Sequence, residues 1–357
     1  MWRFLKVNVL WVILLPLLAV SCHRPEPEPG PEPQPDTFAE GLYILNEGLF
    51  QMNNSTLSYY NFSTGEFTEN IFLDVNHRGL GDVGNDMQKY GSKLYIVVNN
   101  SNIVEVVDAK SVKSLKTINL RGKQPRYITF LGSKAYISCF DGDVVRIDTA
   151  NLEVEATLHT GPNPDGICTC NGKIYVSNSG GLQNPNYGNT VSVIDPVSFT
   201  VTKDIEVVIN PTRIKAYNDR YVFVVSNGNY GSIPYSFQKI DSQTDEVVKT
   251  YDLEVVNFDI HQNLAYIYTY SFSTMTSAWI KVLDLETDEV VKEQFITDGT
   301  QLKTPYCIKV NPLNSDVYIT DAGTFTTNGD VYCFDKNGKK KFSFEAGLNP
   351  SSMVFDY

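Results

Sequence analysis

Short runs of β-branched and aromatic residues, alternating with polar ones, recur along the chain from about residue 41 to residue 357. One such run ends in Asp or Asn in every copy, for example VEVVD and VSVID. The seven copies end at Asn61, Asp108, Asp148, Asp195, Asp241, Asp284 and Asp335. Alternation with a period of two residues, bounded by turn residues, is typical of β-strands. The pattern therefore predicts one strand-containing unit repeated seven times.

Each unit is expected to hold four strands. Another apolar run precedes the Asp-ending one, as in LYIVV and IYVSN, and a further strand follows it after a short turn. The fourth recurring element has Pro near its start in most copies, as in GKQPRYITFLG and GPNPDGICTCNG. Four strands in a period of roughly 45 residues is typical of a β-propeller, because the rungs of a parallel β-helix are far shorter.

The two ends of the repeat region predict how the ring closes. The repeat begins with LYIL, the second strand of a unit, and finishes with GLNPSSMVFDY, which has the form of a first strand. The final strand should therefore complete the N-terminal blade and leave no unpaired strand edge. The predicted fold is all-β: a seven-bladed propeller over residues 41–357, with four antiparallel strands per blade.

The recurring Asp and Asn residues are expected to be structural. A side-chain oxygen at the end of a strand accepts a hydrogen bond from the backbone two residues further on and stabilises a hairpin turn. Because every copy carries this group, it cannot mark a single catalytic site.

The N-terminus predicts export and lipidation. Arg3 and Lys6 precede the apolar stretch 7–20, which is the pattern of a secretory signal peptide over residues 1–21. The sequence AVSC resembles a lipobox in which Cys22 is lipidated, although Ala19 stands where Leu is usual. A plain signal peptide is the alternative.

Residues 22–40 are expected to form an anchor and a spacer. The segment HRPEPEPGPEPQPD (23–36) cannot pack a core and should be extended. Acidic residues soon after the lipidated Cys resemble surface-export signals of Bacteroidetes lipoproteins. We therefore expect an outer-membrane lipoprotein exposed on the cell surface, with the periplasmic face as the alternative and membrane contact through the lipid alone.

Charge excludes one class of partner. The formal net charge is -12, and a surface of that sign repels phosphate backbones. Nucleic acid is not expected to bind.

Five long loops are predicted to share one propeller face, at 46–55, 177–190, 226–236, 269–279 and 320–330. They are rich in Asn, Ser, Gly and Tyr, a composition typical of binding surfaces. The opposite face carries short, charged hairpins. The ligand-binding candidates in these loops are Asn46, Phe50, Tyr187, Tyr230, Trp279 and Phe325.

Charged residues near the starts of the innermost strands form a second group of candidates. These residues, at or beside one register in five successive copies, are Asp86, Arg126, Asp165, Arg213 and Asp259. Neighbouring blades can neutralise one another through them, since buried charges need partners. Alternatively they form a polar floor for a ligand, with Tyr306 and Phe258 as aromatic walls.

Catalytic motifs are missing from the sequence. No HExxH, GxSxG or phosphate-binding glycine loop is present. A propeller lyase or lactonase using Asp82, Asp86 or Asp165 would need His77 or His159 within hydrogen-bonding reach. We expect no catalytic residues, metal or cofactor.

The cysteines other than Cys22 are expected to be free thiols. All of them fall in strand patterns, where Cys behaves as a small apolar residue. Their odd number and spacing fit neither a complete disulfide framework nor a zinc site. They are Cys139, Cys168, Cys170, Cys307 and Cys333.

The strings IYVSN, TVSVIDP and GPNPDGI resemble the YVTN-type β-propellers. With the lipoprotein N-terminus and the opening GLYILNEG, the chain is similar to a Bacteroidetes branch that includes the BtuG-type surface lipoproteins. The resemblance implies capture of a corrinoid on the loop-rich face and its transfer to a TonB-dependent outer-membrane transporter. A protein- or glycan-interaction platform is the alternative, and the lyase or lactonase is the second alternative.

Overall fold

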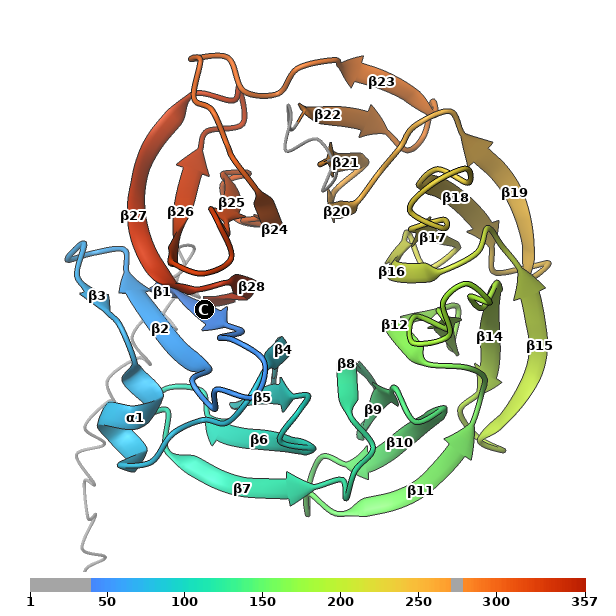
Figure 1. Ribbon diagram of the computed structural model, residues 1–357, viewed down its shortest axis with the longest axis horizontal. Coiled ribbons are helices and arrows are strands. Elements are labelled where there is room, and N and C mark those ends of the chain that lie inside the picture. Colours follow the sequence, from blue (N-terminus) through green and yellow to red (C-terminus); the bar gives the residue numbers. More distant parts are fainter. Residues whose placement is uncertain (1–39, 271–278) are drawn as a thin grey trace, which may run out of the picture. The chain divides into compact units, whose positions relative to one another are not determined.

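Seven four-stranded antiparallel sheets surround a central axis in the computed structural model, which describes residues 40–270 and 279–357 (Figure 1). Each sheet is one blade, and its first strand lies nearest the axis (Figure 1). The predicted propeller is therefore confirmed, with four antiparallel strands in every blade.

Within each blade the four strands follow one another from the central axis outwards. The first holds β28 (Pro350–Asp356), β1 (Gly41–Asn46), β2 (Thr56–Asn61) and β3 (Phe67–Thr68). The second holds β4 (Gly84–Tyr90), β5 (Lys93–Val98), β6 (Ile103–Asp108) and β7 (Ser114–Asn119). The third holds β8 (Pro125–Leu131), β9 (Lys134–Cys139), β10 (Asp143–Asp148) and β11 (Val154–His159). The fourth holds β12 (Pro164–Cys170), β13 (Lys173–Asn178), β14 (Thr190–Asp195) and β15 (Thr200–Glu206).

The remaining blades follow the same order. The fifth holds β16 (Pro211–Tyr217), β17 (Tyr221–Ser226), β18 (Ser236–Asp241) and β19 (Glu246–Tyr251). The sixth holds β20 (Asn257–His261), β21 (Leu264–Thr269), β22 (Trp279–Asp284) and β23 (Glu289–Lys292). The seventh holds β24 (Pro305–Val310), β25 (Val317–Asp321), β26 (Asn328–Phe334) and β27 (Lys340–Leu348).

The C-terminal strand closes the ring as predicted. β28 pairs with β1, so that Tyr43 faces Val354 on one side and Tyr59 of β2 on the other. β1 is therefore a central strand of its blade, with both hydrogen-bonding edges occupied.

The recurring Asp residues form hairpin turns as predicted. The Asp148 carboxylate accepts hydrogen bonds from the backbone N–H groups of Ala150 and Asn151, each at 2.9 Å. A hydrogen bond from Lys134, together with these N–H groups, lowers the pKa of Asp148 to about 2. Equivalent backbone bonds reach Asn61, Asp108, Asp195, Asp241, Asp284 and Asp335.

The core lies between the blades. One cluster of buried residues joins Tyr95 and Val104 of the second blade to Ile128 and Ile137 of the third. A tyrosine in the second strand links several of these interfaces. Tyr43 donates a hydrogen bond to the Ala109 carbonyl of the next blade at 2.7 Å. Buried tyrosines of this kind combine a large apolar area with a bonded hydroxyl, so they fix the spacing of adjacent blades.

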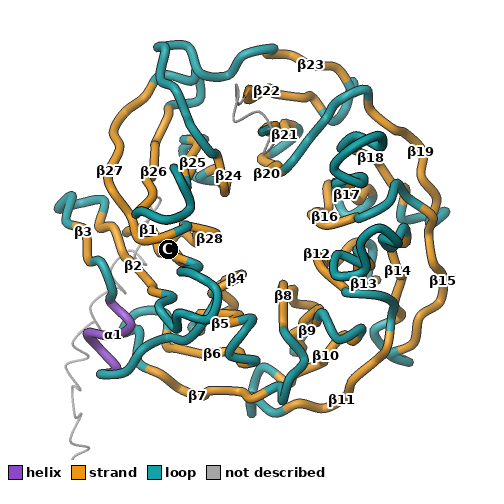
Figure 2. Tube along the Cα trace, in the orientation of Figure 1, coloured by secondary structure: helices purple, strands orange, loops and turns teal. Residues whose placement is uncertain are grey.

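A short helix, α1 (Ile71–Asn76), was not predicted from the sequence. It follows the two-residue strand β3 and leads to the second blade (Figure 2). Asn70 caps it by accepting a hydrogen bond from the Leu73 N–H at 3.2 Å, and Phe72 is buried beneath it. A stretch of six residues is too short for helical periodicity to be recognised.

The predicted signal peptide and most of the predicted spacer, including Cys22, lie outside the described residues. Their assignments stay predictions. In residues 40–270 and 279–357, no helix is long and apolar enough to cross a membrane.

Replacing Ile44 by Ala should lower the free energy of unfolding by about 2–5 kcal/mol, because the cavity left in a fully packed strand cannot collapse. Ile44 is fully buried in β1, whereas Val197 is 91% exposed in a hairpin. The matched control Val197→Ala should change stability by less than about 0.5 kcal/mol. Guanidinium unfolding would measure both, and equal values would contradict the central position of β1.

Candidate functional site

The propeller has two chemically different faces. The loops at 46–55, 177–190, 226–236 and 320–330 join second to third strands, and we call the side that they occupy the loop-rich face. The opposite side carries the short turns that follow the first and third strands, and we call it the hairpin face.

Three tyrosines meet on the loop-rich face and form what we call the tyrosine cluster: Tyr187, Tyr230 and Tyr235. The ring centroids of Tyr187 and Tyr230 are 6.1 Å apart at 78°, and those of Tyr230 and Tyr235 are 6.3 Å apart at 77°. These edge-to-face contacts join loops of the fourth and fifth blades. Tyr230 is nevertheless 61% exposed, and Leu182 in the neighbouring loop is 68% exposed.

A cavity of about 250 Å³ lies beside this cluster. Ile233, Pro234 and Tyr235 line it on the loop side, and Tyr251 and Leu253 line it from the end of the blade. Burial raises the pKa of Tyr235 to about 12, so its hydroxyl is neutral at physiological pH. The cluster thus offers aromatic faces and, at Tyr235, a neutral hydroxyl group to a ligand.

The other loop candidates divide into exposed and structural residues. Phe50 is 65% exposed, and Phe325 packs edge-on against Tyr306 at 5.7 Å. Trp279 begins β22, where the Lys281 ammonium lies 4.8 Å from its ring. The rest of that predicted loop, residues 271–278, lies outside the described residues.

The structure corrects the prediction that Asn46 binds a ligand. Asn46 is 1% exposed, and its side-chain amide nitrogen donates to the hydroxyls of Thr56 and Ser58. Its side-chain oxygen Oδ1 accepts a hydrogen bond from the Gly347 N–H at 3.0 Å. All its polar atoms are engaged within the first blade and the incoming seventh-blade strand, so Asn46 is structural.

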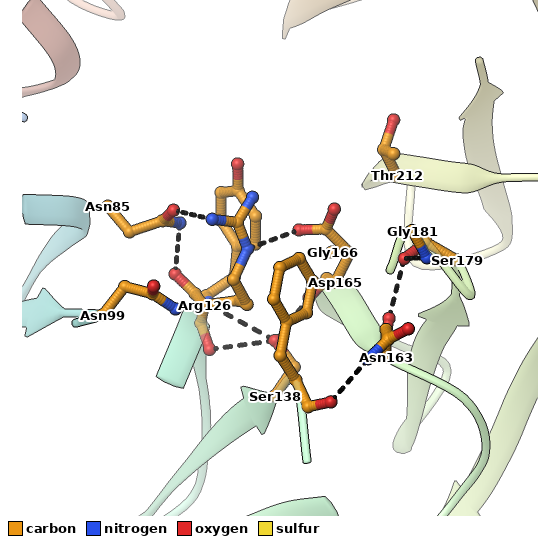
Figure 3. A network of polar contacts seen from close by, with 12 residues as sticks. Asn85, Asn99, Arg126, Ser138, Asn163, Asp165, Gly166, Ser179, Gly181 and Thr212 are labelled. Atoms are coloured by element: carbon orange, nitrogen blue, oxygen red, sulfur yellow. Dashed lines mark hydrogen bonds and ion pairs between the residues drawn. The ribbon is translucent and has the colours of Figure 1, made fainter. Parts of the chain in front are cut away.

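Arg126 links three successive blades at the loop-rich ends of their inner strands (Figure 3). Its Nε lies 3.1 Å from the Asp165 carboxylate in β12, and its Nη1 donates to the Asn85 amide oxygen in β4. Asn85 in turn donates to the Arg126 carbonyl at 2.5 Å. The guanidinium also lies 4.4 Å from the centre of the Phe140 ring. Opposite charges from neighbouring blades therefore neutralise one another here.

Burial raises the pKa of Asp165, and the charge and hydrogen bond of Arg126 oppose that rise. The Asp165 side chain is only 7% exposed. The ion pair therefore favours the charged form of this carboxylate inside the ring, against the effect of burial.

Polar side chains at the ends of second strands, and one in the loop before β12, extend the same network (Figure 3). Asn99 donates to the Pro125 carbonyl at 3.0 Å, and Ser138 donates to the Asp165 carbonyl. Asn163 donates to the Phe140 carbonyl at 2.7 Å. Each bond reaches a neighbouring blade or the loop that leads into it, so the network fixes where the inner strands begin.

A larger cavity of about 720 Å³ occupies the channel between the inner strands, and we call it the channel cavity. Three predicted residues, Asp86, Arg213 and Asp259, line it, whereas Arg126 and Asp165 do not. Its lining extends to residues at the hairpin-face ends of the strands, namely His261, Pro312 and Tyr357. The larger of the two cavities therefore extends towards the hairpin face, whereas a site was predicted on the loop-rich face.

The predicted common register holds for four of the five charged residues. Asp259 faces Tyr266 across the blade, which places it two positions further along its strand than Arg213. Phe258 also departs from prediction, because it is fully buried against Phe237 in the core between blades and lines no ligand surface. Tyr306 lies at the loop-rich end, where its hydroxyl donates to Glu47.

The two histidines that the lyase alternative requires, His77 and His159, lie away from its carboxylates. His159 Nδ1 lies 3.2 Å from Asp143 in a third strand, and His261 Nε2 lies 3.1 Å from the Ser315 hydroxyl. His77 follows α1 in the left-handed conformation. Among the described residues, no histidine contacts Asp82, Asp86 or Asp165. The geometry required by the lyase alternative is thus not found there, and the absence of catalysis stays a prediction.

The cysteines of the described region are free, as predicted: Cys139, Cys168, Cys170, Cys307 and Cys333. Burial raises the pKa of each thiol. Thiols in this state are poor nucleophiles and behave as apolar packing residues.

Sequence reasoning missed the basic residues of the channel cavity, Lys215 and Lys309. A usable signal exists: TRIKAY and YCIKVN place Lys within inner strands that otherwise read as buried. A cation at such a position must face a channel or pair with a buried acid.

A family model described as Domain of unknown function (DUF5074) matches residues 40–356. No curated protein matches the sequence significantly. Many solved structures are similar, and three illustrate the likeness. Hydrazine synthase from Kuenenia stuttgartiensis is 17% identical, with a TM-score of 0.63 over 75% of this chain and 88% of that one.

A quinonprotein alcohol dehydrogenase-like protein from Bacteroides thetaiotaomicron VPI-5482 is 15% identical, with a TM-score of 0.64 over 89% of this chain and 79% of that one. The computationally designed Ika8 protein is 11% identical, with a TM-score of 0.59 over 88% of this chain and 91% of that one. At these identities the likeness shows the propeller fold alone.

Replacing Arg126 by Met should destabilise the propeller by about 1–3 kcal/mol at neutral pH, because Asp165 loses its charged partner. The pKa of Asp165 should then rise further, so protonation relieves the penalty as the pH falls. The loss of stability relative to the parent protein should be largest near about pH 8 and shrink towards about pH 5.

Thermal unfolding across that pH range would measure the deficit, with Arg121→Met as the matched control. Arg121 is exposed and forms no ion pair in the described part of the chain. A deficit that is independent of pH would show that Arg126 acts through packing instead of charge.

Proposed function

The chain belongs to the DUF5074 family, and on this premise we propose that its propeller is a non-enzymatic scaffold that captures a ligand on the loop-rich face. The tyrosine cluster is the observation that carries the proposal. Three tyrosines from two blades contact one another there, yet Tyr230 remains 61% exposed.

The exposure of these side chains has an energetic cost. An aromatic side chain left in water forgoes the stabilisation of burial, and exposed apolar groups that gather in one place mark binding surfaces. Tyrosine suits this role, because it offers a broad apolar face and a polar end with few rotatable bonds. The seven blades hold the loops rigidly, so little ordering is needed when a ligand binds.

The resemblance to cobamide-capturing lipoproteins makes a corrinoid the first ligand to test. Drug-sized ligands occupy pockets of about 300–1,000 Å³, and a corrinoid exceeds that size class. A face with exposed tyrosine rings therefore suits a corrinoid better than the channel cavity does. Its polar amide side chains would meet Asn, Ser and Tyr groups of the loops.

The proposed location follows from the N-terminus. Lipidation of Cys22 would anchor the protein to the outer membrane, and the Pro- and Glu-rich spacer would hold the propeller away from the lipid surface. A captured ligand would then be presented to an outer-membrane transporter, as in the lipoproteins that the chain resembles.

A protein- or glycan-interaction platform is the second candidate. Other exposed apolar side chains of the loop-rich face lie in the loop of the first blade, where Phe50 and Met52 are 65% and 62% exposed. The described cavity at this face holds only about 250 Å³. Apolar side chains exposed on several loops of one face, beside a cavity smaller than drug-sized ligands need, favour a macromolecular partner over a small one.

Cyanocobalamin should co-elute with the purified protein on a sizing column, and Tyr230→Ala and Leu182→Ala should each weaken binding by about tenfold. The matched control is Leu115→Ala, since Leu115 is half-exposed on an outer strand away from both faces. Isothermal titration would give the dissociation constants.

Three outcomes separate the candidates. Clean separation of cyanocobalamin from the protein would eliminate the corrinoid and leave the interaction platform. Binding that Tyr230→Ala and Leu182→Ala do not weaken would place the ligand away from the tyrosine cluster. Equal losses in all three variants would indicate a general loss of structure.

Replacing Cys22 by Ser should release the protein from the membrane fraction, because the substituted residue cannot accept lipid. Labelled palmitate should mark the parent protein and not the variant. A Cys22→Ser variant that still fractionates with membranes would show that another element anchors the chain.

A further inference from the structure

The channel cavity has the dimensions of a small-molecule site. Its volume of about 720 Å³ lies within the range of about 300–1,000 Å³ that ligand pockets occupy. Its lining mixes polar and apolar residues. The apolar residues that are only partly buried are Ala216, Ile260 and Val354, whereas Ile214, Ile308 and Val310 belong to the buried cores between blades. Apolar surface with polar groups placed among it is found in pockets for organic ligands.

Cations outnumber carboxylates among those polar groups. Arg213, Lys215 and Lys309 line the cavity, against Asp86 and Asp259. Lys89 also lines it but is neutralised by Asp356 at 2.9 Å. The cavity is therefore net positive in a chain whose formal charge is -12.

Both carboxylates are already engaged by the protein. Asp259 pairs with Lys215 and accepts a hydrogen bond from the Val310 N–H at 2.9 Å. Asp86 accepts from the Ile128 N–H at 3.1 Å and the Ser352 hydroxyl at 3.4 Å. Their oxygens are thus held by specific partners on the inner strands.

Arg213 and Lys309 form no direct contact with these carboxylates, although the charges of Asp259 and Asp86 act on Lys309 and that of Arg213 acts on Asp86. Within residues 40–270 and 279–357, neither forms an ion pair, and Arg213 is instead held by the Tyr127 ring at 4.9 Å. The charge of Asp259 raises the pKa of Lys309 despite burial, so Lys309 is protonated at neutral pH. Two permanently charged donors therefore face the cavity.

The three cations converge on one region. Burial raises the pKa of Cys307, but the charges of Lys215, Lys309 and Arg213 all act to lower it. Cys307 lies on the inner strand β24 and lines the same cavity. Cations contributed by β16 and β24 thus act on a single point of the channel wall.

We propose that the channel cavity binds a small organic acid, whose carboxylate is held by Arg213 and Lys309 and whose apolar body lies against the partly buried apolar residues of the lining. A guanidinium presents two parallel N–H donors that match a carboxylate, and an ammonium adds a point charge. The lining reaches the hairpin face, on the side opposite the tyrosine cluster. This site is independent of the function proposed for the loop-rich face.

Titration calorimetry with benzoate tests the proposal, with benzamide as a neutral ligand of the same shape. Benzoate should bind the parent protein at least about tenfold more tightly than benzamide. Lys309→Met and Arg213→Met should each weaken benzoate binding by at least about tenfold, whereas Lys309→Arg should retain it. The matched control Lys110→Met, at an exposed hairpin lysine, should bind benzoate as the parent does.

Circular dichroism melting of each variant would show that the propeller remains folded. The proposal is overturned if benzoate does not bind, if benzamide binds equally well, or if Lys309→Met leaves affinity unchanged. Inorganic phosphate serves as a third probe. Binding of phosphate without benzoate would overturn the assignment of an organic acid.

Discussion

The packing of each blade against its neighbours is the interaction on which the rest of this structure depends. A four-stranded blade is one layer thick, so both its faces must be covered by other blades. The buried clusters accordingly join successive blades, as Tyr95 of the second blade and Ile137 of the third illustrate. A row of such blades is stable only when its two ends meet, and β28 provides that closure by pairing with β1.

The same constraint explains the polar groups within the ring. Where inner strands converge, their charged side chains are taken out of water and must find partners on adjacent blades. Arg126 does so by bonding to Asp165 and Asn85, and Lys215 does so by pairing with Asp259. Among the described residues Arg213 and Lys309 form no direct ion pair and interact with the channel carboxylates only at longer range. They make the side-chain charge of the channel cavity positive.

The two faces of the ring are therefore suited to different tasks. The loop-rich face carries tyrosines and exposed apolar side chains on connections that the fold does not constrain closely. The channel cavity is built from strand residues whose positions are set by the packing of the blades. The loop-rich face is suited to a ligand with a large contact area, because its loops can adapt. The channel cavity is suited to a small ligand that it selects by shape and charge.

The sequence by itself determined the number of blades, their strand order, the closing strand and the structural role of the recurring Asp residues. These features depend on the local alternation of apolar and polar residues and on the seven-fold repeat, and both can be recognised from the order of the residues alone. The free thiols followed from the same patterns. The helix α1 was missed, because six residues carry too little periodicity to be recognised.

Only the tertiary structure decided which candidates face solvent and which meet one another. Asn46 and Phe258 carry suitable chemistry but are buried in bonds and packing, while Lys215 and Lys309 reach the channel from strands that read as core. Tyr187 and Tyr230 are 43 positions apart and touch because their blades are neighbours. The physical reason is that the channel and the loop-rich face are each assembled from all parts of the ring. No local pattern records how far a strand is shifted relative to the next blade.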